Sequence, residues 1–109
     1  MQTKQAIAAL SALAQQSRLA VYRLLLEHAP DGLAASAIAE KLGLANATLS
    51  FHLKELVHAG LITNRQEGRF IYYSPIIETM TALVSYLTEN CCSASDQSCE
   101  PASAKKAHD

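Results

Sequence analysis

The stretch Asn46–Gly60, NATLSFHLKELVHAG, constrains the fold of this 109-residue chain most strongly, because its pattern predicts one amphipathic helix. Its apolar residues recur with helical spacing and share one face: Leu49, Leu53, Leu56 and Gly60, with Val57 beside them. The opposite side carries small, polar and cationic residues and no acid: Ala47, Ser50, Phe51, Lys54 and His58. Such a helix can pack on a core and present its outer side to a DNA major groove, although an ordinary surface helix has the same pattern.

The residues before this stretch supply a supporting framework. Two helices are predicted, Thr3–Ala14 and Ser17–His28; the second is apolar nearly all round, which indicates burial on several sides, and Ser17 is a candidate N-cap. After a break at residues 29–32, a two-turn helix at Ala35–Leu42 ends at Gly43. A tight link then leads to the next helix, whose N-cap is Asn46 or Ala45. Two short helices joined in this way form a helix-turn-helix.

The residues after Gly60 change from helical to alternating periodicity. Strands are expected at Leu61–Gln66 and Arg69–Ser74, joined by a turn at Glu67-Gly68. A last helix follows at Ile76–Glu89, with Ser74 as its cap and Pro75 at its first position. This helix has more apolar surface than one packing face needs, which favours a dimer contact.

The expected fold is therefore mainly α with a small β-hairpin, in the order α-α-α-α-β-β-α of a dimeric winged helix-turn-helix. Residues 1–90 form the DNA-binding and dimerisation domain, and residues 91–109 a flexible tail that contains all three cysteines. No stretch is long and apolar enough for a membrane span, and no secretory signal is evident, so a cytoplasmic location is expected. Residues 1–89 hold seven basic and seven acidic residues, so any DNA affinity must come from local placement of charge.

Three segments carry a resemblance to a known family: LSALAQQSRLAVYRLL, IAEKLGLANATLSFHLKELVHAGLI and RQEGRFIYYS. Over about residues 6–87 the chain resembles the ArsR/SmtB metal-sensing repressors of bacteria. The chain departs from the family pattern at Gln15-Gln16, Ala34 and Ala45. These departures remove helix caps but leave the expected fold unchanged. The resemblance implies a homodimer joined through the first and last helices, with each recognition helix in the major groove of double-stranded operator DNA.

By matching positions, the resemblance assigns the DNA contacts to the recognition helix and the wing. Ser50 and Thr48 can donate to phosphates or base edges, Lys54 can neutralise a phosphate, and Phe51 can touch a thymine methyl group. His52 has two interpretations that we weigh equally, a DNA contact and a core-edge hydrogen bond that orients the helix. Arg65 and Arg69 are expected to flank the wing tip, the alternative being a solvated hairpin. The expected DNA-binding set is Asn46, Ala47, Thr48, Ser50, Phe51, His52, Lys54, Arg65 and Arg69.

The effector site is expected at Cys91, Cys92 and Cys99. The helix before the recognition helix lacks the family's Cys-x-Cys motif, and the last helix lacks the Asp and His of its zinc site. An adjacent cysteine pair can turn both sulfurs to one ion, and the third thiol can fold back across a six-residue spacer. Three thiolates with no nitrogen or oxygen ligand select a soft acceptor, and trivalent arsenic, which takes three ligands in a pyramid, fits best. Antimonite, Sb(III), fits similarly.

The leading hypothesis is thus an arsenite-responsive repressor that leaves its operator when the tail thiols bind As(III). One alternative is a redox-sensing repressor, in which Cys99 forms a disulfide with Cys91 or Cys92. Another is a metalloid carrier with no DNA function. A third, an enzyme, is set aside because the sequence has no nucleophile-base arrangement, no phosphate-cradling glycine loop and no acid pair.

Overall fold

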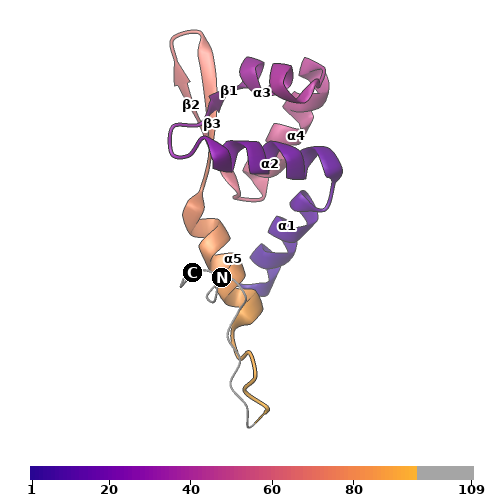
Figure 1. Cartoon of the computed structure of the whole chain (residues 1–109), viewed down its shortest axis with the longest axis vertical. Coiled ribbons are helices and arrows are strands. Elements are labelled where there is room, and N and C mark those ends of the chain that lie inside the picture. Colours follow the sequence, from indigo (N-terminus) through magenta and orange to yellow (C-terminus); the bar gives the residue numbers. More distant parts are fainter. Residues whose placement is uncertain (96–109) are drawn as a thin grey trace.

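The computed structural model describes residues 1–95, which form five α-helices and one three-stranded antiparallel sheet (Figure 1). The helices are α1 (Thr3–Leu13), α2 (Gln16–Glu27), α3 (Ala35–Leu42), α4 (Asn46–His58) and α5 (Ile77–Thr88). The strands are β1 (Leu33–Ala34), β2 (Ile62–Glu67) and β3 (Phe70–Pro75), in the spatial order β1-β3-β2. The predicted winged helix-turn-helix is confirmed, and β1 is an addition that the sequence did not reveal. None of the described helices is long and apolar enough to span a bilayer.

The core is built where α4 crosses α2. Leu49, Leu53 and Leu56 of α4 are buried, as the helical spacing predicted. They pack in one cluster with Val21, Leu25 and other buried residues of α1, α3, the β2 end and α5. The expectation that α2 is buried on several sides is wrong for part of that helix, because Leu19 and Leu26 are exposed.

The start of α2 and the end of α4 differ from the predictions, and the structure decides between the two candidate N-caps of α4. The N-cap of α2 is Gln15, whose side chain accepts a hydrogen bond from the Arg18 backbone at 2.8 Å, so Ser17 lies inside the helix. Asn46 is the first residue of α4 and Ala45 is its N-cap. Gly60 lies beyond the end of α4 with a φ of +77°, so it closes the turn and is no part of the apolar stripe.

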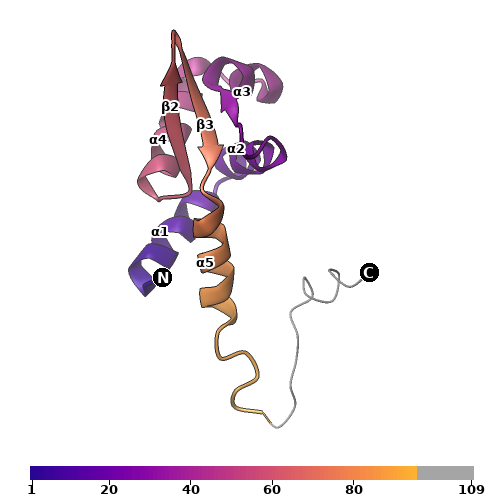
Figure 2. The ribbon, with the colours of Figure 1, turned by 90° about the vertical axis from the view of Figure 1, so that its left-hand side faces the viewer.

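The wing is a β2–β3 hairpin that extends beside α4 (Figure 2). Glu67 pairs with Phe70, so the two-residue loop is Gly68-Arg69, one residue later than predicted. Gly68 has a φ of +61° at the first loop position, where type II′ turns need glycine. At the other end Ser74 pairs with Thr63, and Pro75 pairs with Ile62. The predicted cap at Ser74 and helical Pro75 are therefore wrong: ladder pairing extends the strand, and Ile76 is the N-cap of α5.

The short strand β1 brings the chain so close to the wing that Gly32 has no room for a side chain. A Cβ atom there would lie 2.1 Å from the Tyr73 carbonyl oxygen of β3, and the φ of Gly32 is +84°. Leu33 and Ala34 then pair with Tyr73 and Tyr72. This close approach fixes the root of the wing against the helix-turn-helix.

We predict that Gly32→Ala lowers the free energy of unfolding by about 1–3 kcal/mol, because it adds a backbone clash to an unfavourable φ. Gly43→Ala is the matched control: the φ of Gly43 is +65°, but a Cβ atom added there would have no other atom within 4 Å. Urea unfolding measures both. Equal losses in the two variants would show that the contact with β3 carries no stability.

Candidate nucleic-acid interface

The outer side of α4 is an open surface of small, polar and cationic residues. Its exposed members are Asn46, Ala47, Thr48, Ser50, Phe51 and Lys54. Phe51 leaves 56% of its surface exposed although it is a large apolar residue. Because the buried leucines hold the opposite side of α4, these residues form a rigid ridge whose side chains can enter a groove.

The N-terminus of α4 lies at one end of this ridge and lacks a side-chain cap. Ala45 has no hydrogen-bonding side chain, and no acidic residue lies in the first turn. Leu49 has the first backbone N–H group of this helix that makes a hydrogen bond, and it donates to the Ala45 carbonyl at 2.9 Å. The preceding N–H groups and the positive end of the helix dipole therefore suit a phosphate oxygen.

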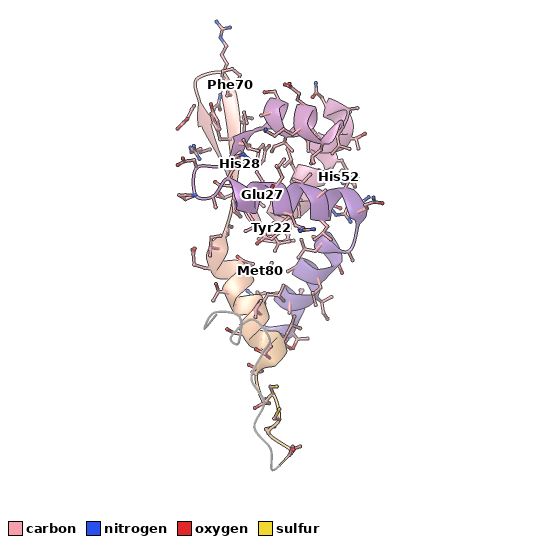
Figure 3. All side chains as sticks on the ribbon, viewed as in Figure 1. Tyr22, Glu27, His28, His52, Phe70 and Met80 are labelled. Carbon is pink, nitrogen blue, oxygen red and sulfur yellow. The ribbon has the colours of Figure 1, made fainter. Side chains whose placement is uncertain are left out.

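His52 differs from the other predicted contacts because it lies on the inner side of α4 (Figure 3). Only 7% of its surface is exposed, and its Nδ1 atom has no hydrogen-bond partner among residues 1–95. The hydroxyl of Tyr22 on α2 is also buried without such a partner, and burial raises the pKa of this phenol. The inward position removes His52 from the contact surface, and the expected orienting hydrogen bond is absent from the described part of the chain.

The two predicted wing arginines have different surroundings. Arg65 donates to the Asp31 carbonyl at 2.9 Å and to the Glu67 carboxylate at 3.2 Å, and its guanidinium carbon lies 5.1 Å from the centre of the Tyr72 ring. Arg69 lies in the exposed loop at the wing tip and makes no such contact with residues 1–95. Phe70, labelled near the wing tip in Figure 3, is exposed beside it. Arg65 is thus held by its own chain, whereas Arg69 can reach a phosphate.

A second exposed surface lies at the end of the molecule opposite the wing tip, on α1 and α5 (Figure 1). These two helices are joined by a hydrogen bond between the Thr3 and Tyr86 hydroxyls. Their outer sides expose several large apolar residues: Ile7, Leu10, Ile77, Val84 and Leu87. An exposed apolar patch shared by two neighbouring helices is typical of a protein–protein contact.

The predicted thiol site begins just beyond the end of α5. Glu89 is the C-cap of the helix, and Asn90 and Cys92 have φ values of +63° and +65°, so the chain turns sharply there. The Sγ atoms of Cys91 and Cys92 lie 3.5 Å apart. No group of three or more His, Cys, Asp or Glu residues able to hold a metal ion is found within residues 1–95. The predicted third ligand, Cys99, lies outside the described residues.

The chain is similar in sequence to known helix-turn-helix proteins. A family profile described as a helix-turn-helix domain matches residues 13–65. The chain is 32% identical over 80 residues to a protein of Halobacterium salinarum named "Putative arsenical resistance operon repressor ArsR2", covering 73% of this chain and 66% of that one. The chain spans 62–66% of the length of the curated relatives that it matches.

Two solved structures resemble the fold closely. The crystal structure of NolR from Sinorhizobium fredii has a TM-score of 0.63 and 31% identity, covering 81% of this chain and 85% of that one. The other is the solution structure of a homodimeric winged helix-turn-helix DNA-binding domain from Mycobacterium bovis, described as a possible ArsR-family transcriptional regulator. Its TM-score is 0.65 at 27% identity, with 88% of this chain and 89% of that one covered.

The different surroundings of the two wing arginines predict different salt dependences of DNA binding. Arg69→Gln should reduce the slope of log K against log salt by about one, because one phosphate contact is lost. Arg65→Gln should weaken binding several-fold by loosening the wing, yet leave the slope nearly unchanged. Fluorescence anisotropy with a random-sequence duplex at several salt concentrations measures both. A slope change for Arg65→Gln equal to that for Arg69→Gln would mean that Arg65 contacts phosphate directly.

Proposed function

This chain belongs to the ArsR family of winged helix-turn-helix transcriptional regulators, which are not enzymes, and we propose that it is an As(III)-responsive repressor. It acts in the cytoplasm as a homodimer on double-stranded operator DNA. Binding of the metalloid by Cys91, Cys92 and Cys99 releases it from the operator. The observation that carries the effector assignment is the pair of sulfurs 3.5 Å apart at the end of α5.

The apolar patch on α1 and α5 supports the homodimer. Val84 and Leu87 of α5 expose 46% and 56% of their surface, and Ile7 of α1 exposes 58%. Burying such side chains against a second copy is favourable by roughly 1.5–3 kcal/mol for each one fully buried. A two-fold dimer on this patch would hold two recognition helices at a fixed spacing, which we expect to be about one DNA turn, roughly 34 Å.

The spacing of the vicinal sulfurs supports a soft ion as effector. Two sulfurs bound to one ion at about 2.3 Å each lie roughly 3.5–3.8 Å apart for bond angles near 100–110°. Cys91 and Cys92 meet this separation, and because Cys92 is disulfide-bonded in this structure, its sulfur must be reduced before it can bind an ion. Thiolates prefer soft acceptors, and a third thiol from Cys99 would complete the three-sulfur set that As(III) or Sb(III) takes.

The position of the thiols supports their coupling to DNA affinity. Cys91 follows the last residue of α5 by three positions, and its backbone N–H donates to the Thr88 carbonyl at 3.0 Å. Ordering this segment around an ion would change the end of a helix that lies in the proposed dimer contact. A typical allosteric coupling of about 1–3 kcal/mol would weaken DNA binding by roughly 5- to 150-fold.

Disruption of the α1–α5 patch should separate the dimer. We predict that Leu87→Lys gives a monomer in sedimentation velocity at micromolar concentration, because it places a charge in an apolar contact. Leu26→Lys, which changes an exposed leucine of α2, is the matched control and should remain dimeric. A dimeric Leu87→Lys protein would place the contact elsewhere.

The effector assignment predicts that arsenite releases a labelled duplex selected by the protein from a random pool. We expect a 5- to 150-fold loss of affinity for the wild-type chain, roughly the range of typical allosteric coupling. Little or no loss is expected for Cys91→Ser, Cys92→Ser or Cys99→Ser, since each removes one of three ligands. Ser95→Ala, a nearby substitution without a thiol, should respond like wild type.

The same experiment separates the alternatives. Release by arsenite at an unchanged concentration in the cysteine variants would contradict the assignment. Release by peroxide under conditions where arsenite has no effect would favour a redox sensor, in which a disulfide joins two of the three cysteines. Arsenite binding by a wild-type chain that binds no duplex would favour a carrier.

A further inference from the structure

A pocket of about 230 Å³ lies between α4 and the wing. Its walls come from three elements: α4 supplies Ser50, Lys54, Val57 and His58, β2 supplies Asn64, and β3 supplies Tyr73. Only Ser50 and Lys54 belong to the predicted DNA-contact set. His58, Asn64 and Tyr73 are additional, and the fold brings them to the same place.

The pocket is lined by five side chains that carry a polar group, together with Val57, and by no acidic residue. Lys54 brings an ammonium group, His58 an imidazole, Asn64 an amide and Ser50 and Tyr73 hydroxyls, and each of these groups can donate a hydrogen bond. Within residues 1–95, none of the five side chains makes a hydrogen bond or ion pair with another residue. Five uncommitted donors around one pocket suit an anion with several acceptor oxygens, such as a phosphodiester.

Backbone geometry holds these donors on rigid elements. Ser50, Lys54 and His58 are spaced four residues apart, so they lie along one side of α4. Asn64 and Tyr73 are directly opposite each other in the β2–β3 ladder, so their side chains leave the hairpin on the same face. The pocket is therefore formed where one side of a helix meets one face of a hairpin.

We propose that this pocket binds a backbone phosphate of duplex DNA, on the strand that separates the groove entered by α4 from the groove covered by the wing. The assignment rests on the proposed function, because it takes α4 as the recognition helix. A strand that passes between helix and wing must cross the pocket. The phosphate contact fixes the register of the protein on DNA and carries no sequence information.

The test uses the full chain and two random-sequence duplexes of unrelated sequence. Asn64→Ala and Tyr73→Phe should each lower the affinity about tenfold, and equally on both duplexes, because each removes one hydrogen bond to a charged oxygen. Neither should change the salt slope. Lys54→Gln should reduce that slope by about one, because it removes a cation.

Two neighbouring substitutions provide matched controls. Thr63→Ala and Tyr72→Phe change residues of the same two strands whose side chains leave the opposite face of the hairpin, and both should bind like wild type. Tyr73→Phe keeps its ring, so an unchanged melting temperature separates a lost contact from a lost fold.

The outcomes separate this inference from the proposed function. Salt-dependent binding by wild type with unchanged affinity in Asn64→Ala and Tyr73→Phe would overturn the phosphate pocket and leave the repressor assignment intact. A second result would also overturn the phosphate pocket: inorganic phosphate raises the melting temperature of wild type but not of these variants, while the DNA affinity of the variants stays at the wild-type value. The ligand of the pocket would then be a free anion and not a DNA phosphate. No binding of any duplex by wild type would overturn both proposals.

Discussion

The packing of α4 on α2 is the contact on which the rest of this structure depends. Leu49, Leu53 and Leu56 are each 2% exposed or less, and burial of a leucine stabilises a fold by roughly 1.5–3 kcal/mol. This contact fixes which side of α4 faces outward, and so places Ser50, Phe51 and Lys54 in the open. It also sets the side of α4 that meets β2 and β3 to form the phosphate pocket. The outer side of α4 is therefore already exposed within one protomer.

In the proposed function, DNA recognition and effector binding are assigned to different parts of the chain. The proposed DNA contacts lie on α4 and the wing, whereas Cys91 and Cys92 follow α5 at the opposite end of the molecule (Figures 1 and 2). Between them lies the α1–α5 patch, where two copies are proposed to meet. In this arrangement an effector need not touch the recognition helix, since a change in the geometry of the dimer moves both recognition helices relative to their half-sites.

Periodicity predicted those parts of the fold whose signal is local. The bounds of α3, Ala35–Leu42, are as predicted, because its apolar spacing and the glycine after it both mark them. His52 lies three residues after Leu49 and four before Leu56, so helical spacing alone could have placed it on the buried stripe. The two residues of β1 have no periodicity to detect. The contact of Arg65 with Asp31 joins residues 34 positions apart, which no local pattern contains.

The pocket shows why register matters for a site. A turn at Glu67-Gly68 would have paired Asn64 with Ile71, whereas the observed loop at Gly68-Arg69 pairs it with Tyr73.

The proposal that thiols beyond α5 control the binding of α4 to DNA is tested most directly by thermodynamic linkage. Arsenite affinity should be measured by calorimetry for the free protein and for its complex with a selected duplex. DNA should weaken arsenite binding by the same factor by which arsenite weakens DNA binding. Equal arsenite affinities of the free protein and the complex would contradict control of DNA binding by the thiols.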